Sequence, residues 1–477
     1  MLAIDIGSSS IRCSLEHEGE IESVQKICSL TLNVCSVVDV VESLVSQCLS
    51  SIKFENIKVS QVALTGFAMN LFGVDNENEP CTELFTYVNA GEKATDQIVA
   101  LKQSLDEKKL EHICGSTGTR FYHQSYATLR LRHMDSSYIK RFHTIASFLM
   151  YRWSGRFDCP ISLSEASWTG MVNVQTMDWD ADIIQIIGDH VATKLPVIVS
   201  TLFSVGFLET YKSKWPALRY AKIVVGIPDG LAANVGSGCC TNTRIAVTVG
   251  TSAAVRVIVK RSEILEFVPA IVQAGLFCYC IDDTRVIVGG ALTDGGSVFE
   301  WVNRNVRTDV ETEAKATSMN PPGIHGLVVL PYLNGERSTG WRLDAKMAII
   351  GITNATEPHH ILRASLEAVG TCVGRLIGII LALIPHDSLP ILVISGTALE
   401  KSSLLKQIIA DVSGLSLYEG PFLNEVTSRG ASRFAAGENI LCPPGILAAV
   451  PNRAYHDIYQ NDILRKQERI QDLLFSI

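Results

Sequence analysis

Two stretches about half a chain apart share one pattern, and this repetition constrains the fold more than any other feature of the sequence. Residues 1–15 form a short apolar run, a turn of Gly7, Ser8, Ser9 and Ser10, and a second run that alternates as a returning strand does. Residues 245–257 repeat the arrangement around Gly250, Thr251 and Ser252. The N–H groups and hydroxyls of such turns can bind phosphate oxygens. The spacing indicates a duplicated architecture, with one phosphate-binding hairpin from each half facing a shared cleft.

Two aspartates stand beside these patterns. Asp229 follows an apolar strand at 223–227 and opens an alanine-rich segment with helical character. A carboxylate at a strand-to-helix junction is well placed to accept a proton, although Asp is also a favoured helix N-cap. Asp5 comes just before the first turn, where a carboxylate could hold a hydrated Mg²⁺.

Composition narrows the class of protein. With 477 residues the chain is expected to form two or three domains, and 47% hydrophobic and 19% charged residues indicate a compact globular protein. The net charge of −8, without a run of basic residues, argues against a nucleic-acid partner. The 13 cysteines include no CxxC pair, so they predict small buried side chains in a reducing cytosol and no zinc site.

The sequence also predicts no membrane segment. The start of the chain lacks a basic-then-apolar signal, because Asp5 interrupts it. The most apolar window, 376–384, is far shorter than the roughly 20 residues that span a bilayer. We therefore expect a soluble cytoplasmic protein. The long apolar region 358–384 is expected to be a core helix.

Further elements can be placed along the chain. A strand at 62–65 ends in Gly66-Phe67-Ala68-Met69-Asn70, at the kind of strand end where α/β sheets bind ligands. A strand at 389–394 ends near Gly396 and precedes a helix at 402–412. Helices are also predicted at 37–51, 93–111 and, as an amphipathic surface helix, 120–133.

Together these pieces resemble the FGGY carbohydrate kinases, a branch of the actin-like, sugar kinase and Hsp70 ATPase superfamily. The resemblance covers nearly the whole chain. Residues 5–12 and 249–252 resemble the two phosphate motifs, 351–367 follows the C-terminal signature in spacing, and 395–411 resembles the adenosine-binding segment. Met347 departs from the small residue expected there. The stretches LFCYCIDDTRVIVGG, LPYLNGERSTGW and GIPDGLAANVGSG look most like gluconate kinases.

The resemblance implies an α/β fold of two RNase H-like domains, 1–240 and 241–477, with the active cleft between them. The N-terminal domain would bind the sugar and carry the first phosphate hairpin, and the C-terminal domain would bind the nucleotide. The implied reaction is ATP- and Mg²⁺-dependent phosphorylation of a sugar or sugar acid at a primary hydroxyl, with gluconate as the first candidate. A kinase for a neutral ketose or polyol, or an impaired nucleotide-binding sugar sensor, stays open, as does a homodimer.

The resemblance also implies roles for particular residues. Asp229 would be the catalytic base and Asp5 the metal ligand, while Met69, Asn70 and Asp229 would contact the sugar. The expected nucleotide-binding residues are Asp5, Gly7, Ser8, Ser9, Ser10, Arg12, Gly250, Thr251, Ser252, Gly296, Gly396 and Thr397.

Three positions depart from the family on the sugar side: Asn70, Asn89 and Ala146. Because gluconate carries a carboxylate, its site needs donors of positive charge or N–H groups. Arg120 and Arg337 are the candidates for this role.

Overall fold

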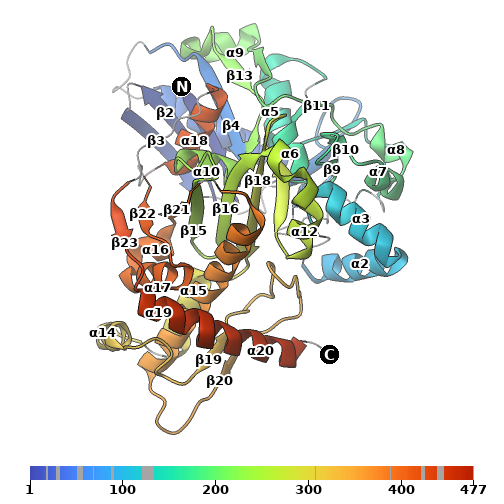
Figure 1. Cartoon of the computed structure of the whole chain (residues 1–477). Coiled ribbons are helices and arrows are strands. Elements are labelled where there is room, and N and C mark those ends of the chain that lie inside the picture. Colours follow the sequence, from blue (N-terminus) through green and yellow to red (C-terminus); the bar gives the residue numbers. More distant parts are fainter. Residues whose placement is uncertain are drawn as a thin grey trace.

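The chain is built around two separate seven-stranded sheets, one from each half of the sequence (Figure 1). The computed structural model describes residues 1–17, 20–27, 33–50, 57–67, 69–86, 91–120, 131, 134–158, 160–306, 308–386, 388–420, 425–437 and 445–475, without the side chains of 91–95.

The N-terminal sheet has the strand order β12-β13-β4-β1-β2-β3, and β14 also pairs with β4. Its strands are β1 (Leu2–Ile6), β2 (Ser10–His17), β3 (Glu20–Ile27), β4 (Gln61–Gly66), β12 (Ser204–Gly206), β13 (Lys222–Val224) and β14 (Ile227–Pro228). The hairpin β1–β2 is antiparallel, whereas β1, β13 and β14 all run parallel to β4. The ends of β1, β4 and β14 therefore lie along the same edge of the sheet. Helices α1 (Val34–Leu49), α5 (Ile145–Ser154) and α9 (Glu209–Lys214) also belong to this half.

The C-terminal sheet has the order β17-β18-β16-β15-β21-β22-β23. Its strands are β15 (Arg244–Val249), β16 (Ala253–Lys260), β17 (Phe277–Cys280), β18 (Arg285–Leu292), β21 (Ile391–Ser395), β22 (Leu417–Glu419) and β23 (Leu447–Ala449). Here too an antiparallel hairpin, β15–β16, lies beside a parallel strand, β21. The two sheets thus share the same local arrangement around their hairpins.

The helices of the C-terminal half lie around this sheet and below it in Figure 1, except α18, which lies beside the N-terminal sheet. They are α11 (Arg261–Ile264), α12 (Val268–Gln273), α13 (Gly296–Val306), α14 (Val310–Ser318), α15 (Pro358–Leu383), α16 (Thr397–Lys401), α17 (Ser403–Ser413), α18 (Val426–Ala435), α19 (Arg453–Ile458) and α20 (Leu464–Phe475), with the small sheet β19 (Val328–Leu330) and β20 (Ala348–Ile350). By length and composition α15 could cross a membrane. However, 67% of its most apolar window is buried inside the protein, as the prediction of a core helix requires.

A series of short elements connects the strands of the N-terminal half and lies to the right in Figure 1. They are β5 (Asn70–Val74), β6 (Phe85–Thr86), α2 (Gly91–Ser104), α3 (Glu107–Thr117), β7 (Arg141–His143), β8 (Ile161–Ser162), α6 (Leu163–Ser167), β9 (Val172–Asn173), β10 (Asp178–Trp179), α7 (Ala181–Ile187), α8 (Asp189–Ala192) and β11 (Ile198–Val199). The prediction of a single helix at 93–111 is wrong. This region forms two helices, because Asp106 accepts a hydrogen bond from the N–H of Lys109 at 2.9 Å and starts α3 as an N-cap. Most of the helix predicted at 120–133 lies outside the described residues.

Two short helices from different halves of the chain join the sheets. Helix α10 (Asp229–Gly236) crosses α18 closely, and α18 also packs on β1 and β4 of the N-terminal sheet. Gly236 lies against the carbonyl of Val426, and Gly430 lies against that of Ala232, so neither position has room for a Cβ atom. The absence of side chains at these two glycines therefore brings the helices together.

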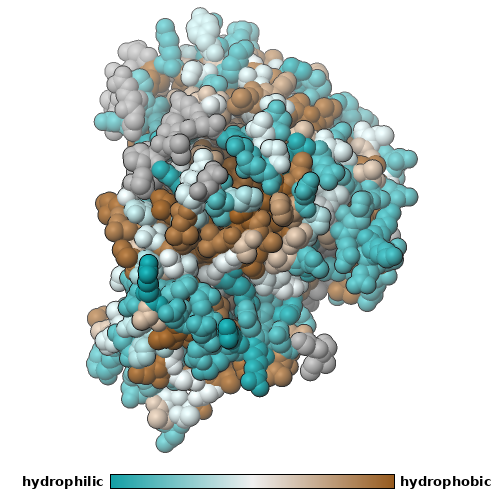
Figure 2. All heavy atoms as spheres, viewed as in Figure 1, coloured by the Kyte–Doolittle hydropathy of each residue, from teal (hydrophilic) through white to brown (hydrophobic). Residues whose placement is uncertain are grey.

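The surface on this side of the molecule is not uniform. Hydrophobic residues gather in a band across the middle of the view, while the surface over α2, α3, α19 and α20 is mostly hydrophilic (Figure 2). The helix α20 is amphipathic, with Leu464, Gln467 and Gln471 as its buried residues.

Candidate active site

Asp5 and Asp229 lie at the same edge of the N-terminal sheet. Asp5 is opposite Thr65 of β4, and Thr65 is in turn opposite Ile227 of β14, two residues before Asp229. Burial, and second the negative charge of Asp229, raise the pKa of Asp5 to about 7. The two carboxylates are therefore close enough to repel each other.

One guanidinium group lies among these acids. The Nη1 atom of Arg12 is 3.9 Å from the Asp5 carboxylate, and its Nε is 3.3 Å from that of Glu425. Glu425 precedes α18 and reaches this place from the far half of the chain. Arg12 also donates a hydrogen bond to Gln25 at 2.9 Å, so its side chain is held on several sides. Asp5 and Glu425 thus both lie within ion-pair distance of Arg12.

This donor set suits Mg²⁺. The ion prefers oxygen ligands and is commonly held by one or two carboxylates, with water and substrate phosphates completing its shell. In the described part of the chain no three His, Cys, Asp or Glu residues gather as a complete metal cage. A pair of carboxylates at a phosphate-binding turn matches the magnesium chemistry and not a permanent structural site.

Asp229 is the first residue of α10, and not its N-cap as the simpler interpretation expected. The N-cap is Pro228, which offers no side-chain hydrogen bond. The Asp229 carboxylate accepts a hydrogen bond from the N–H of Gly230 at 2.6 Å. A negative charge at a helix N-terminus is stabilised by the helix dipole. The Asp229 carboxylate is thus fixed at the start of α10.

Each of the two predicted phosphate turns is closed by a main-chain hydrogen bond, although the first turn spans residues 7–10 and the second only 250–252. In the first, the Gly7 N–H donates to the Ser10 carbonyl at 2.9 Å, and in the second the Gly250 N–H donates to the Ser252 carbonyl at 2.9 Å. The side chains between are exposed in both turns: Ser8 and Ser9 in one, Thr251 and Ser252 in the other. No atom lies within 4 Å of a Cβ built on Gly250. A ligand could therefore approach the second turn directly.

Several predicted nucleotide-binding residues meet at one cavity of about 350 Å³ in the C-terminal half. Gly250, Thr251, Gly296 and Thr397 all line it, together with residues from α13 to α17. Gly396 does not line it. With a φ of 102°, Gly396 lies so close to β15 that an added Cβ would be 2.5 Å from the carbonyl oxygen of Val249. The residues of the first turn also lie outside the lining of this cavity.

Met69 and Asn70, predicted to face the sugar, are both buried. The Asn70 amide nitrogen donates to the Phe67 carbonyl at 2.8 Å, and its oxygen accepts from the N–H of Ile145 at 2.7 Å. Asn70 therefore ties the start of β5 to the start of α5. Met69 has a φ of 56°, a left-handed conformation at the same bend. The departure at Asn89 lies outside the described residues.

Glu165 is a residue that the sequence analysis missed. Its side chain is buried beside Gly226, where an added Cβ would be 3.0 Å from the Glu165 carboxylate and in contact with Ala146. Burial raises the pKa of Glu165 to about 7, although the Thr144 hydroxyl donates to it at 3.3 Å. The only signal in the sequence is Ser162-x-x-Glu165, which reads as a helix capping box.

The two arginines considered for a substrate carboxylate have different surroundings. Arg120 donates to the carbonyls of Val272 at 2.9 Å and Gln273 at 2.6 Å, so it holds the end of α12. Arg337 lies near Tyr279, where its positive charge counteracts the rise in pKa that burial causes. The Tyr279 ring packs on Trp168 with centroids 5.1 Å apart, and a Cβ built on Gly230 would touch Trp168 at 2.5 Å. Of the two arginines, Arg337 is thus connected by packing to the start of α10.

Two hairpin-bearing sheets with phosphate-type turns define a two-domain α/β fold of the actin and hexokinase ATPase type. The comparisons give the family. The N-terminal domain of the FGGY family of carbohydrate kinases matches residues 1–236, and its C-terminal domain matches residues 245–437. The chain belongs to the FGGY family of carbohydrate kinases and is therefore a phosphotransferase.

Two relatives within the family are gluconokinases. The gluconokinase of Bacillus subtilis (strain 168) is 24% identical over 383 residues, which are 74% of this chain and 70% of that protein. The gluconokinase of Bacillus licheniformis is 28% identical over 268 residues, 53% of this chain and only 50% of its own length.

Solved structures of the same fold are similar over almost the whole chain. A ligand-bound xylulose kinase from Lactobacillus acidophilus matches with a TM-score of 0.86 and 21% identity, covering 99% of this chain and 98% of that one. A gluconate kinase from the same organism matches with a TM-score of 0.85, 21% identity and the same coverage.

Proposed function

We propose that the protein transfers the terminal phosphate of ATP to a primary hydroxyl of a sugar acid, with gluconate as the substrate. The observation that carries this proposal is the position of Asp229. Asp229 is the first residue of α10, at the edge of the N-terminal sheet, and its carboxylate is close enough to Asp5 to raise the pKa of that group. A base beside a metal-binding acid is what phosphate transfer to an alcohol requires.

The nucleotide would lie in the cavity lined by Gly250, Thr251, Gly296 and Thr397. The N–H groups and hydroxyls of the second turn would bind its phosphates, and the first turn with Arg12 would contribute from the opposite sheet. Asp5 would hold Mg²⁺, which when bound neutralises charge on the phosphates. In this proposal the sugar site belongs to residues 1–240 and the nucleotide site to residues 241–477, and the enzyme acts in the cytoplasm.

Asp229 would accept the proton of the attacking hydroxyl. The Gly230 N–H holds this carboxylate at the start of the helix, where it would accept a hydrogen bond from the substrate hydroxyl. As the hydroxyl oxygen attacks the terminal phosphorus of ATP, the bond from that phosphorus to the bridging oxygen breaks, ADP leaves, and the hydroxyl proton passes to the Asp229 carboxylate. The contribution expected from a general base of this kind is about 10²- to 10⁴-fold in rate.

The choice of gluconate depends on the relatives and on charge. Two relatives are gluconokinases, and Arg337 is connected to the start of α10 through Tyr279 and Trp168. Both polar atoms of the Asn70 amide already bond backbone groups, so this departure gives no reason to prefer a neutral sugar.

A neutral ketose or polyol is the second candidate. A xylulose kinase structure matches this fold as well as a gluconate kinase structure does, with TM-scores of 0.86 and 0.85. An impaired nucleotide-binding sensor is the third, motivated by the departures at Asn70, Asn89 and Ala146.

The test is release of ADP from ATP across a panel of sugar acids, ketoses and polyols, with Asp229→Asn as the variant. We expect gluconate to be phosphorylated, and Asp229→Asn to bind ATP while kcat falls by at least about 100-fold. Asp106→Asn is the matched control, because Asp106 is also at a helix start but is exposed and belongs to α3. A near-normal kcat in Asp229→Asn would overturn the assignment of the base. Nucleotide binding without ADP release on any sugar would favour the sensor.

A further inference from the structure

The second phosphate turn is held in place by main-chain contacts with the start of α13. The N–H of Gly295 donates to the Thr251 carbonyl at 2.8 Å, and the N–H of Gly296 donates to the Gly250 carbonyl at 2.7 Å. An added Cβ on Gly296 would be 2.7 Å from the Gly250 oxygen. Because the two backbones are in direct contact, the turn follows any movement of the start of α13.

A buried carboxylate fixes the start of α13. Asp294 is 3% exposed and accepts from the Ser297 hydroxyl at 2.9 Å. Its other two bonds come from one residue: the main-chain N–H of Asn334 at 2.9 Å and the Asn334 side-chain amide at 2.8 Å. No ion pair to Asp294 occurs within the described part of the chain, so neutral donors alone compensate its burial. Hydrogen bonds to a charged acceptor of this kind are among the stronger ones in proteins.

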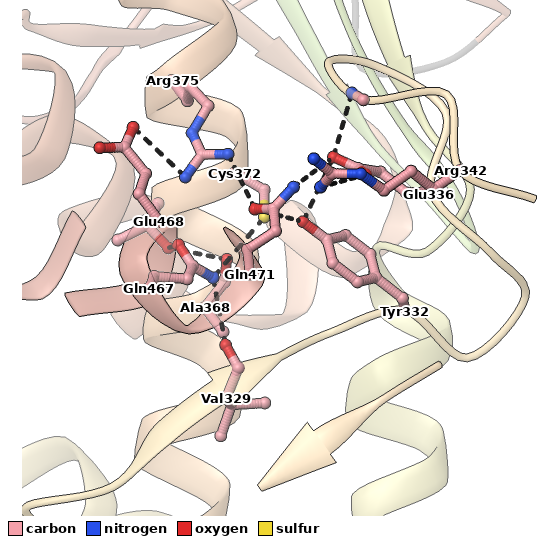
Figure 3. A network of polar contacts seen from close by, with 12 residues as sticks. Val329, Tyr332, Glu336, Arg342, Ala368, Cys372, Arg375, Gln467, Glu468 and Gln471 are labelled. Carbon is pink, nitrogen blue, oxygen red and sulfur yellow. Dashed lines mark hydrogen bonds and ion pairs between the residues drawn. The ribbon is translucent and has the colours of Figure 1, made fainter. Parts of the chain in front are cut away.

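The loop that contains Asn334 is anchored on its other side. Glu336 is 2% exposed and accepts from the N–H of Gly340 at 3.1 Å and from the side-chain amide of Gln471 at 2.9 Å. Gln471 comes from α20 and also accepts from Tyr332 and Arg375, each at 3.1 Å. Figure 3 shows Gln471 between these side chains, with Arg342 on the far side of Glu336. Asn334 is thus presented by a loop that is itself fixed to the core.

We propose that Asp294 and Asn334 are positioning residues for the nucleotide phosphates. Their contact sets the start of α13 and, through Gly295 and Gly296, the second phosphate turn. Neither residue needs to touch the nucleotide. This inference rests on the proposed nucleotide site, but it makes a separate claim about how that site is held.

The test measures nucleotide binding to the full-length protein by calorimetry with MgADP and no sugar present. Asn334 is exposed, so Asn334→Ala should fold normally. We expect its Kd for MgADP to rise about tenfold, the effect of losing one hydrogen bond to a buried charge. Asn305→Ala is the matched control, because Asn305 is an exposed asparagine of α13 whose amide bonds within the helix, to the Trp301 carbonyl at 2.8 Å.

Exchanging the two residues distinguishes positioning of the phosphate turn from a merely structural role. In the double variant Asp294→Asn with Asn334→Asp, the new amide at 294 can donate to the new carboxylate at 334, and its oxygen can still accept the main-chain N–H. We expect Asp294→Asn alone to weaken MgADP binding and the double variant to recover most of it. Hydrogen exchange of the amides at 250–252 should accelerate in the single variants and slow again in the double variant.

The outcomes separate this inference from the proposed function. A wild-type protein that does not bind MgADP would overturn the proposed nucleotide site, and this inference with it. Binding by wild type together with unchanged binding in Asn334→Ala and Asp294→Asn would overturn this inference alone. A binding defect that the exchanged pair does not repair would also count against it.

Discussion

Replacing Asp5 by Asn should stabilise the protein without Mg²⁺ or nucleotide, in a way that depends on pH. Burial and the neighbouring Asp229 raise the pKa of Asp5 to about 7. In the unfolded chain an Asp titrates near its ordinary value of about 3.9. A difference of about three pKa units corresponds to about 4 kcal/mol between the protonated and ionised forms.

The sign follows from which state binds the proton more tightly. The folded protein binds the Asp5 proton more tightly than the unfolded chain does. The contribution of Asp5 to the free energy of unfolding is therefore fully present below about pH 4 and is lost as the pH rises to about 7. Asn cannot ionise and resembles the protonated acid in shape. The variant should therefore match wild type near about pH 3.5 and exceed its free energy of unfolding by up to about 4 kcal/mol at pH 8.5.

The assay is urea unfolding of both proteins at a series of pH values, with EDTA present. Asp282→Asn is the opposite control. Although burial alone would raise the pKa of Asp282, hydrogen bonds from Arg285 and Thr284 hold it below its usual range. Its replacement should lower stability at pH 8.5 and matter less as the pH falls. A gain from Asp5→Asn that is absent at pH 8.5, or equal at both ends of the series, would refute the argument. Added Mg²⁺ should stabilise wild type at pH 8.5 but not Asp5→Asn.

Two further predictions concern the phosphate turns and the sugar. Ser9→Val or Thr251→Val should raise the KM for ATP or lower kcat, while the KM for the sugar stays nearly unchanged. If both variants instead lose thermal stability without a nucleotide-specific kinetic defect, the turns are only structural. If gluconate is the substrate, Arg337→Leu should reduce kcat/KM for gluconate at least about tenfold, and added salt should weaken wild-type gluconate affinity because it screens a charge contact. Arg120→Leu should lower the stability of the protein without changing its preference for gluconate over ketoses. If the wild-type enzyme has a kcat/KM for a neutral ketose about ten times that for gluconate, gluconate is excluded as the substrate.

Much of the fold could be predicted because its signals are local. The hairpins around Gly7 and Gly250 each lie within about fifteen residues of sequence, and strand alternation and turn residues identified both. The core helix at 358–384 followed from its apolar length, and the structure has it at Pro358–Leu383. The break at Asp106 was missed since the helical pattern continues on both sides of the N-cap.

The candidate site was harder to predict because its contacts are long-range. Ser162-x-x-Glu165 resembles a capping box, yet the Glu165 carboxylate accepts from Thr144, a residue of another element. Asn70 was assigned to the sugar by its place at a strand end, but both atoms of its amide bond the backbone. Nothing local to Glu425 indicates that it lies 3.3 Å from Arg12. These partners depend on how distant segments pack, which residue spacing does not encode.

Glu425 lies well past the predicted domain boundary near residue 240, yet it contacts Arg12 of the N-terminal sheet. Helix α18 follows that boundary by almost two hundred residues but packs on β1, β4 and α10 of the N-terminal half. Because Gly236 and Gly430 bring the backbones of α10 and α18 into direct contact, the two helices cannot approach further, and separating them would expose the buried side chains between the sheets.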